Sequence, residues 1–309
     1  SGLQGANIMQ HLIGMGIDSI QSQPQTYHLK LRTRITLNTR RIANMTQYLA
    51  IIPARYASTR FPGKPLVDLN GKPMIQRVYE QAKKVLDTVI VATDDQRIYD
   101  CVKAFGGDVV MTSPNHTCGT DRVYEAYQHY CATSSIAINH EETVVINIQG
   151  DEPFIQPEQV KALMNCFPTE IATLVHPFTE NDTLNDLQNS NYVKVAIAFE
   201  NNLEKATTGR AMYFSRNIIP YIRGLQPNEW LQQRKHYRHI GMYAYRADVL
   251  QKITQMPPSS LEKMECLEQL RWLENGLTIR VAVTEHISIG IDTPEDLQHA
   301  LRYLNNKSN

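Results

Sequence analysis

The 309 residues are enough for one large α/β domain or two smaller ones, and a hydrophobic share of 42% is ordinary for a globular protein. The 31 Lys and Arg residues balance the 31 Asp and Glu residues, which disfavours a protein that coats nucleic acid through general basicity. The five cysteines include no Cys-x-x-Cys pair, which disfavours a zinc ribbon and fits a reducing cytosol, and no apolar run approaches the roughly 18 residues that cross a bilayer.

Residues 1–44 differ in composition from the rest of the chain. They are rich in Gln, Thr, Arg and Asn, and their apolar residues follow no sustained period. They also lack the compact charged, apolar and small-residue regions of a secretory signal. We therefore expect an N-terminal extension over 1–44, disordered or of vector origin, and a folded domain over 45–309 that starts at Met45. The alternative is an ordered amphipathic helix over residues 8–20.

The first strand and the loop after it carry the clearest chemical signal. Residues 49–52 form an apolar run that predicts a buried strand, and Pro53 should end it because proline has no N–H for a sheet ladder. The loop that follows carries Arg55, Arg60 and Lys64 among small residues. This composition is typical of a polyphosphate site at the C-terminal end of a parallel strand, although three cations also suit a solvated basic loop. The loop matches neither a Walker A motif nor a G-x-G-x-x-G turn.

Alternating helical and strand patterns follow this loop. Apolar residues repeat every three or four positions over 74–82, which predicts a helix with one buried face. Strands are expected at 88–93 and 108–111, with a helix between them that Asp94 or Asp95 caps. The order β-α-β-α-β implies a parallel sheet with helices on both faces.

The alternation continues to about residue 180. A polar loop over 113–122 leads into a helix over about 120–131, and the β-branched run 143–148 predicts a strand. Asp151 and Glu152 follow this strand, which places two carboxylates at the C-terminal edge of the sheet. A helix over about 156–167 and a strand over 171–175 are expected next.

The pattern changes near residue 181. Residues 193–199 and 237–245 alternate with period two, which predicts longer antiparallel strands that extend one side of the sheet. We expect this part to carry an acceptor site, a dimer face or both. The last expected elements are a helix over 261–275 that ends at Gly276, a strand over 277–283 and a helix over 294–304.

Nine motifs in fixed order carry a family resemblance. They are IIPARYASTRFPGKPL from Ile51, GKPMI from Gly71, VATDD from Val91, GTDR from Gly119, NIQGDEP from Asn147, YFSRNIIP from Tyr213, RHIGMYAYR from Arg238, SSLEKMECLEQLRWLENG from Ser259 and IDTPEDL from Ile291. From Met45 onward, the chain resembles the 3-deoxy-manno-octulosonate cytidylyltransferases, also called CMP-Kdo synthetases. One such motif is weak evidence, whereas nine in the family's order are specific.

The resemblance implies a fold and a reaction. The fold is α/β, a Rossmann-like nucleotidyltransferase with a mostly parallel sheet, helices on both faces and an antiparallel extension that forms the acceptor and dimer region. The implied divisions are a CTP-binding half at about 45–180, an acceptor and dimerisation part at about 181–260, and C-terminal helices with a metal aspartate at 261–309. The implied reaction transfers CMP from CTP to the sugar acid Kdo and releases pyrophosphate. It requires Mg²⁺, takes place in a cytoplasmic homodimer and supplies lipopolysaccharide synthesis.

The resemblance also implies a CTP site. Arg55 and Lys64 would hold the triphosphate together with backbone N–H groups, and Arg60 would reach either a phosphate or the carboxylate of the acceptor. Backbone carbonyls of the 113–122 loop would accept from the cytosine amino group. The implied CTP-binding residues are Arg55, Ala57, Ser58, Lys64, Ser113, Gly119, Arg122 and Gln149, and the implied catalytic residues are Lys64, Asp151, Asp292 and Arg60.

Two positions in the base-recognition loop leave alternatives open. Arg122 is similar to a family residue near the base and ribose, but together with Asp121 it also suits a cap of the following helix. Cys118 stands where the family usually has Ser. A thiol is a weak hydrogen-bond partner, so backbone contacts should carry recognition at this position.

The acceptor and metal residues implied by the resemblance come from later in the chain. The sugar-binding residues are Arg60, Gln149, Arg216, Arg223, His239, Tyr243, Glu268 and Gln269, and the metal ligands are Asp151 and Asp292. Each has a structural alternative: His239 as a core histidine, the two arginines as dimer contacts, Glu268 and Gln269 as a solvated helix face, and Asp292 as a helix cap.

Two other functions compete with transfer to Kdo. One is a cytidylyltransferase for another sugar acid, such as 8-amino-Kdo or a sialic acid, and the other is a non-catalytic module that binds CTP. Both aspartates that the resemblance implies as metal ligands are present, and so is Lys64, which disfavours the second.

Overall fold

The structure of the chain is a computed structural model that describes residues 46–57, 61–200, 207–286, 290–291 and 293–307. The chain divides between Met45 and Thr46, and every element described here lies in the second unit. The predicted extension over 1–44 lies outside the described residues and stays a prediction. Among the described residues, no helix combines the length and apolar character needed to span a membrane.

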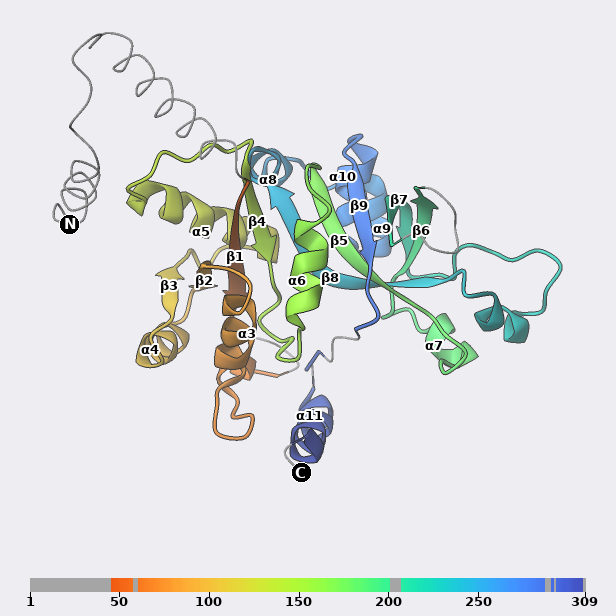
Figure 1. Cartoon of the computed structure of the whole chain (residues 1–309), viewed down its shortest axis with the longest axis horizontal. Coiled ribbons are helices and arrows are strands. Elements are labelled where there is room, and N and C mark those ends of the chain that lie inside the picture. Colours follow the sequence, from red (N-terminus) through yellow and green to blue (C-terminus); the bar gives the residue numbers. More distant parts are fainter. Residues whose placement is uncertain (1–45, 58–60, 201–206, 287–289, 292, 308–309) are drawn as a thin grey trace, which may run out of the picture. The chain divides into compact units, whose positions relative to one another are not determined.

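The described residues form one nine-stranded sheet in the order β3-β2-β1-β4-β8-β5-β9-β7-β6, and β8 also pairs with β6 (Figure 1). All of these strands run in one direction except β7 and β8. The predicted α/β class with a mostly parallel sheet is therefore confirmed. The strands are β1 (Gln47–Ala54), β2 (Thr88–Thr93), β3 (Asp108–Met111), β4 (Thr143–Asn147), β5 (Ile171–Pro177), β6 (Lys194–Phe199), β7 (Thr208–Ser215), β8 (Tyr237–Arg246) and β9 (Ile279–Val283).

Helices cover both faces of this sheet because successive side chains of the buried strands point alternately into two apolar cores. Ala50 and Ile52 of β1 lie in a core with α3, α4 and α6, whereas Leu49 and Ile51 lie in a core with α5, α8 and α10. The helices are α3 (Met74–Lys83), α4 (Gln96–Ala104), α5 (Gly119–Thr133), α6 (Pro157–Met164), α7 (Leu184–Gln188), α8 (Ala247–Thr254), α9 (Ser260–Glu265), α10 (Gln269–Glu274) and α11 (Pro294–Lys307).

Strand β1 is longer than predicted because it continues through Pro53. Pro53 pairs with Ala92 of β2, so the expectation that proline ends the strand is wrong. The carbonyl of Ile51 accepts from Ile148, which shows that odd-numbered residues of β1 point their polar groups toward the β4 side. The β4 ladder ends at Ile51, so the missing N–H of Pro53 faces a position where no ladder partner is required.

Strand β8 lies inside the sheet and not at its side. It pairs antiparallel with β4 and with β5, and it carries the period-two segment that we expected to extend one edge. Its residues Met242 to Tyr245 are buried, since helices cover both faces at this position. The antiparallel part of the fold therefore reaches the centre of the molecule.

The single helix expected over 261–275 is two helices, α9 and α10. Cys266 ends α9 in the left-handed region with φ 52°, and the chain then turns into α10 at Gln269. Apolar periodicity spans the break because Leu261 and Leu270 both pack into the same core. The break directs the residue before α10, Glu268, toward α5.

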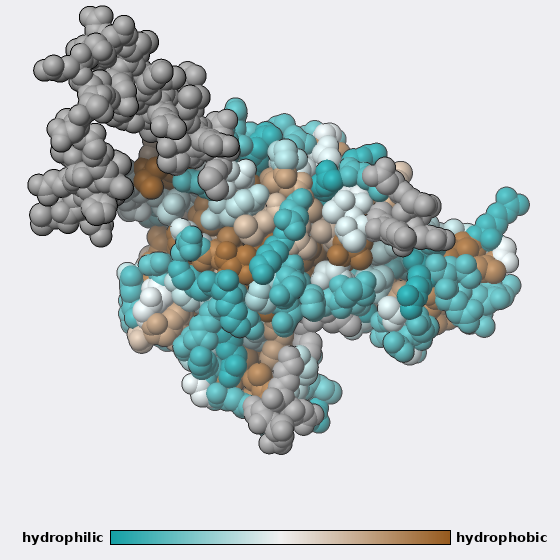
Figure 2. Space-filling model, viewed as in Figure 1, coloured by the Kyte–Doolittle hydropathy of each residue, from teal (hydrophilic) through white to brown (hydrophobic). Residues whose placement is uncertain are grey.

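The C-terminal helix, α11, packs against the segment that follows the loop after β1. Ile291 and Ala300 share a small apolar core with Leu69, Met74 and Phe154. A separate apolar cluster, formed by Phe178, Leu187, Trp230 and Leu231, lies under the long segment between β7 and β8. The face drawn in Figure 2 is mainly hydrophilic over the described residues, with smaller apolar areas between.

Candidate active site

A cavity of about 450 Å³ lies at the C-terminal ends of β1 and β4. Ligands of open α/β sheets bind at this edge, because loops from neighbouring parallel strands meet there. The cavity brings together Arg55, Ala57, Lys64, Gly119, Gln149 and Asp151, all of which were predicted as site residues. Its other lining residues are Pro53, Ala54, Pro65, Thr117, Cys118 and Gly150.

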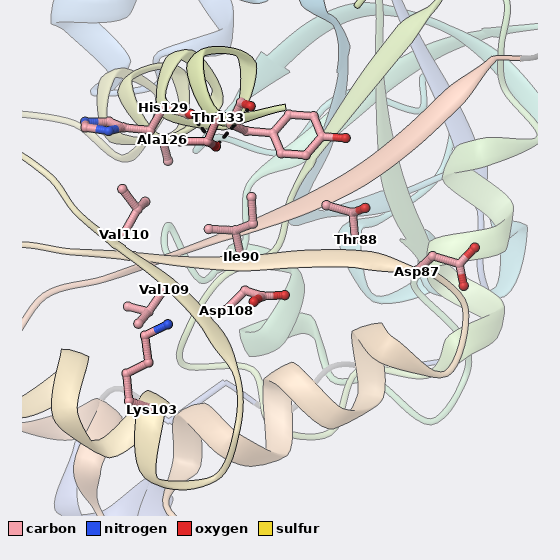
Figure 3. Close-up of a pocket in the computed structure, with 11 residues that line it drawn as sticks. Asp87, Thr88, Ile90, Lys103, Asp108, Val109, Val110, Ala126, His129 and Thr133 are labelled. Atoms are coloured by element: carbon pink, nitrogen blue, oxygen red, sulfur yellow. Dashed lines mark hydrogen bonds between the residues drawn. The ribbon is translucent and has the colours of Figure 1, made fainter. Parts of the chain in front are cut away.

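A second cavity, of about 420 Å³, lies elsewhere on the same sheet (Figure 3). It is lined by Asp87 and Thr88 at the start of β2, by Asp108 at the start of β3, and by His129 and Thr133 of α5. It therefore lies near the N-terminal ends of the strands, away from the edge where α/β proteins bind ligands. We take the cavity at the C-terminal edge as the candidate active site.

An ion pair joins the loop after β1 to the end of β4. Lys64 Nζ lies 2.6 Å from Asp151 Oδ2, and the two side chains are 12% and 32% exposed. Lys64 starts a short 3₁₀ helix after Gly63, which has φ 70°, a conformation that favours glycine. The alternative of a fully solvated basic loop therefore does not hold for Lys64, because this turn directs its side chain inward to Asp151.

The strand ends around the cavity approach each other closely. A Cβ on Gly150 would lie 2.9 Å from the Pro53 carbonyl oxygen, so glycine is required where the β4 loop passes the end of β1. Gln149 Nε2 donates to the Gly241 carbonyl of β8 at 3.1 Å. The Gln149 contact connects the cavity to β8.

The loop from Thr112 to Cys118 contributes its last residues to the cavity, while its first residues are held by α5. Arg122 is fully buried and donates to Thr112 and to Asp94 at 2.5 and 2.7 Å. Ser113 donates its backbone N–H to Glu125. Neither Ser113 nor Arg122 is among the lining residues of the cavity, since Ser113 lies in the first part of the loop and Arg122 is buried on α5.

Glu268 connects the cavity to the helices beyond it. Its carboxylate accepts from Thr120 Oγ1 at 2.7 Å and from Cys118 Sγ at 3.6 Å. Burial raises its pKa, and the Thr120 hydrogen bond opposes this rise. Burial and the neighbouring Glu268 raise the pKa of Cys118 to about 12, so the thiol stays protonated and donates to the carboxylate. Glu268 therefore lies on an inward face, which excludes the solvated-face alternative.

Aromatic side chains of β8 form the next group of residues beyond the Glu268 carboxylate. Tyr243 packs between Tyr245, Trp272 and His239, with ring centroids 5.8, 5.2 and 5.3 Å away. His239 Nε2 lies 3.0 Å from Thr173 Oγ1. Burial lowers the pKa of His239 to about 3, so the ring is neutral at pH 7 and cannot serve as a cation. Gln269 is buried at the start of α10.

The two arginines predicted for the acceptor lie in different settings. Arg216 Nε donates to the Glu265 carbonyl at 2.6 Å, and its other nitrogens donate to the carbonyls of Ser190 and Cys266. Its guanidinium is therefore fixed against the end of α9. Arg223 lies on an exposed segment, and no contact within the described part of the chain joins it to the cavity lining.

Three predicted site residues, Ser58, Arg60 and Asp292, lie outside the described residues. The chain neighbour of Asp292, Ile291, donates its N–H to the Asp151 carbonyl at 3.0 Å. Within the described ranges, no group of three His, Cys, Asp or Glu side chains is arranged to hold a metal ion.

Sequence reasoning missed two charged residues near these positions, of which one is fully buried. Lys194 is fully buried, and its ammonium donates to the carbonyls of Arg216 and Asn189 at 2.7 and 3.0 Å. The available signal was a single lysine in the otherwise apolar run VKVAIAF. Glu125 was missed as well, although it lies three positions after Arg122 and so shares its helix face.

Comparison with known proteins agrees with this geometry. The cytidylyltransferase family model matches residues 49–279. The chain is 58% identical over 267 residues to the 3-deoxy-manno-octulosonate cytidylyltransferase of Parabacteroides distasonis, covering 85% of this chain and 100% of that protein. It is 48% identical to the protein of the same name from Porphyromonas gingivalis, covering 84% and 97%.

A solved structure is also similar. It is the CMP:2-keto-3-deoxy-manno-octonic acid synthetase complexed with CTP, which is 37% identical, has a TM-score of 0.71, and covers 84% of this chain and 99% of its own. These similarities extend over nearly the whole length of the relatives, and eight of the nine motifs on which the resemblance was based lie within residues 49–279, which the family model matches. The chain belongs to the cytidylyltransferase family, among the 3-deoxy-manno-octulosonate cytidylyltransferases.

Proposed function

We propose that this protein transfers CMP from CTP to Kdo, giving CMP-Kdo and pyrophosphate and so activating Kdo for lipopolysaccharide synthesis. The observation that carries the proposal is the 58% identity, over the full length of the relative, to a protein named for this activity. The cavity supports it, because it combines cations for a triphosphate with a carboxylate at the end of a parallel strand.

The triphosphate binds to the loop after β1. Arg55 and Lys64 line the cavity and carry the positive charge, and the backbone at Ala57 lies beside them. The anomeric oxygen of the acceptor attacks the α-phosphorus of CTP, a new P–O bond forms, and the bond to the pyrophosphate oxygen breaks. Positioning and charge neutralisation supply most of the catalysis in such transfers. Lys64 therefore acts on the phosphate charge and, through its ion pair, orients Asp151.

Asp151 and Asp292 are proposed as the ligands of Mg²⁺. Asp151 fits this role because its carboxylate is one-third exposed at the cavity, where a hard oxygen donor is available. The hydrogen bond from Ile291 to Asp151 supports the pairing, since Ile291 precedes Asp292 in the chain. When bound, Mg²⁺ would neutralise charge on the phosphates of CTP.

The acceptor is proposed to bind between Gln149, Glu268 and β8. Gln149 and Cys118 line the cavity, and Cys118 contacts Glu268. Glu268 offers a carboxylate for sugar hydroxyls, and the neutral His239 offers a hydrogen-bonding group but no charge. The cation that meets the Kdo carboxylate must therefore come from an arginine, of which Arg60 is the proposed one.

Pyrophosphate release tests this proposal directly. The protein is assayed with CTP and Mg²⁺ against Kdo, 8-amino-Kdo and N-acetylneuraminic acid, with product identified by mass spectrometry. Highest kcat/KM with Kdo is expected. Equal or higher kcat/KM with another sugar acid would reassign the acceptor, and CTP binding without turnover of any of them would reduce the protein to a binding module.

The metal assignment has its own test. Asp151→Asn and Asp292→Asn should each raise the Mg²⁺ concentration needed for half-maximal rate and lower the maximal rate. Asn caps a helix about as well as Asp, so a purely structural Asp292 would leave turnover near normal. Glu158→Gln, on the exposed surface of α6, is the control for a general loss of negative charge.

We also propose that the protein is a cytoplasmic homodimer. Met212 and Tyr221 belong to the part expected to form the dimer and are 58% and 73% exposed, which is unusual for large apolar side chains. The cysteines are free, as expected in a reducing compartment. Analytical ultracentrifugation of the protein and of Met212→Lys tests the dimer, which the lysine should weaken.

A further inference from the structure

The loop between β3 and α5 lies outside the sheet and lines part of the cavity. It leaves β3 after Met111 and reaches α5 at Gly119. Its last residues, Thr117 and Cys118, line the cavity opposite the phosphate loop. Its conformation therefore has to be held by contacts other than the sheet ladder.

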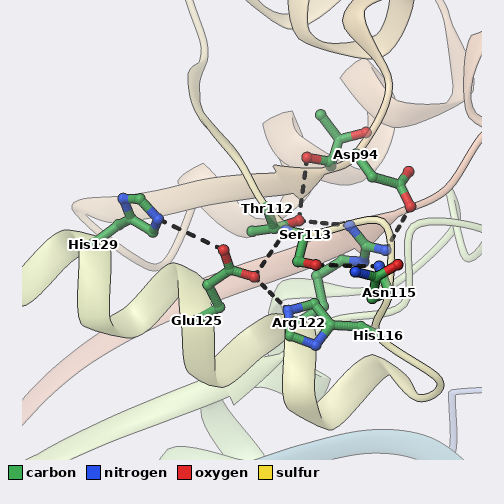
Figure 4. Close-up of polar contacts among 9 residues, drawn as sticks. Asp94, Thr112, Ser113, Asn115, His116, Arg122, Glu125 and His129 are labelled. Atoms are coloured by element: carbon green, nitrogen blue, oxygen red, sulfur yellow. Dashed lines mark hydrogen bonds and ion pairs between the residues drawn. The ribbon is translucent and has the colours of Figure 1, made fainter.

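Two residues of α5 hold the loop from below (Figure 4). The first is Arg122, which donates to Thr112 Oγ1 and to Asp94 Oδ2. Thr112 is bound in turn to the Thr93 carbonyl at the end of β2, through both its backbone N–H and its hydroxyl. These hydrogen bonds fix the point where the loop leaves the sheet.

The second is Glu125, one helical turn after Arg122. Its carboxylate Oε2 accepts from the Ser113 backbone N–H at 2.9 Å and contacts His116 Nε2 at the centre of the loop. Although burial alone would raise the pKa of Glu125, the contacts with Ser113 and His116 lower it. His129 approaches the other oxygen at 3.8 Å, but it belongs to α5 and not to the loop.

We propose that Glu125 is a positioning residue for nucleotide recognition: by holding Ser113 and His116, it keeps Thr117 and Cys118 in the conformation that lines the cavity. The inference rests on the proposed function and on the expectation, implied by the family resemblance, that backbone carbonyls of this loop accept from the cytosine amino group. Weakening the contacts of Glu125 with Ser113 and His116 lowers the affinity for CTP and the discrimination against UTP, whereas the groups around the α-phosphate are unchanged. The expected signature is a higher KM for CTP with kcat nearly retained.

Glu125 is suited to a test because it is 26% exposed and its loss need not prevent folding. The variants are Glu125→Ala, which removes both loop contacts, Glu125→Gln, which keeps an acceptor for Ser113, and His116→Gln. The matched control is His129→Gln, which alters a half-exposed histidine on the same carboxylate without touching the loop. Thermal unfolding of each variant separates loss of fold from loss of positioning.

Titration calorimetry with CTP and with UTP, followed by steady-state kinetics, gives the outcome. Glu125→Ala is expected to weaken CTP binding about tenfold, corresponding to about 1.4 kcal/mol. It should lower the preference for CTP over UTP by a similar factor and change kcat by less than about threefold. Glu125→Gln should recover part of the loss, His116→Gln should resemble Glu125→Ala, and His129→Gln should match the parent protein.

Three results would overturn the proposal. Folded Glu125→Ala with unchanged CTP binding and an unchanged preference for CTP over UTP shows that the loop does not need the contacts of Glu125. Equal losses in His116→Gln and His129→Gln show an effect of charge on α5 and not of the loop. A loss confined to kcat shows a role in chemistry. Failure of the proposed function is a separate result, since it would appear in the parent protein itself, as absent turnover or as an equal or higher kcat/KM with another sugar acid, whatever the Glu125 variants show.

Discussion

Removal of the Lys64 ammonium should affect CTP use more than folding. Lys64→Ala breaks an ion pair of 2.6 Å whose carboxylate partner, Asp151, is one-third exposed. Leaving one member of a fully buried pair alone costs about 3–5 kcal/mol, but water reaches Asp151 and reduces this penalty. We expect a loss of about 1–2 kcal/mol in the free energy of unfolding. For a chain of this size that is a fall of roughly 2–8 °C in melting temperature.

The loss in catalysis should be larger. A hydrogen bond from an ammonium to a phosphate is worth about 1.5–3 kcal/mol, which predicts a fall of roughly 10- to 150-fold in kcat/KM for CTP. Pyrophosphate release at saturating Kdo measures this value, and differential scanning fluorimetry measures the melting temperature. Lys64→Met separates the two effects further, because it keeps the aliphatic stem and removes only the charge.

Lys72→Ala is the matched control for loss of a lysine from an ion pair. Lys72 pairs with Glu80 at 2.7 Å, but both side chains are more than 40% exposed, so the pair should contribute under about 1 kcal/mol. It should leave CTP kinetics unchanged. If Lys64→Ala lowers the melting temperature strongly while kcat/KM for CTP stays at the parent value, Lys64 is a structural residue and the assignment to phosphate fails.

Three further predictions are independent of this one. Burial lowers the pKa of Lys194 to about 8 from an ordinary 10.5, so the unfolded chain binds more protons between these values. Relative to Lys194→Met, the protein should therefore gain stability as pH rises from 8 to about 10.5, and a pH-independent difference in denaturant midpoint would contradict this. At pH 8, iodoacetamide should label the exposed Cys266 well before Cys118, whose pKa is about 12, as peptide mass spectrometry can show. A chain that begins at Met45 should fold and use CTP like the full chain, and loss of either property would make residues 1–44 part of the functional protein.

Local patterns were sufficient for the first half of the sheet. The expected strands at 88–93 and 108–111 are β2 and β3 to the residue, and Asp95 caps α4 by accepting from Arg97, as proposed for one of two aspartates. These elements depend on short-range features, namely β-branched runs, apolar periodicity and an N-cap, which the sequence states directly. The cavity at the C-terminal ends of β1 and β4 follows from the same topology.

Long-range packing decided what the patterns could not. The position of β8 between β4 and β5 depends on which edges are free once the parallel strands have formed, and period two is the same for a central and an edge strand. The break at Cys266 was invisible because apolar spacing continues across it. The partner of Lys64 was hidden for a similar reason, since it lies 87 residues away in the chain.

The sequence by itself determined the fold class, the family and the edge of the sheet that carries the site, because strand order, turn residues and ordered motifs are local and cumulative. The tertiary structure decided which charged side chains face the cavity and which support it from behind. Arg55 and Lys64 line the cavity, whereas Arg122, which the resemblance implied to be near the base and ribose, is buried and binds Thr112 and Asp94. The burial and pairing of a charged side chain depend on segments that are remote in the chain. The sequence alone therefore does not distinguish a charged residue that binds a ligand from one that binds another side chain.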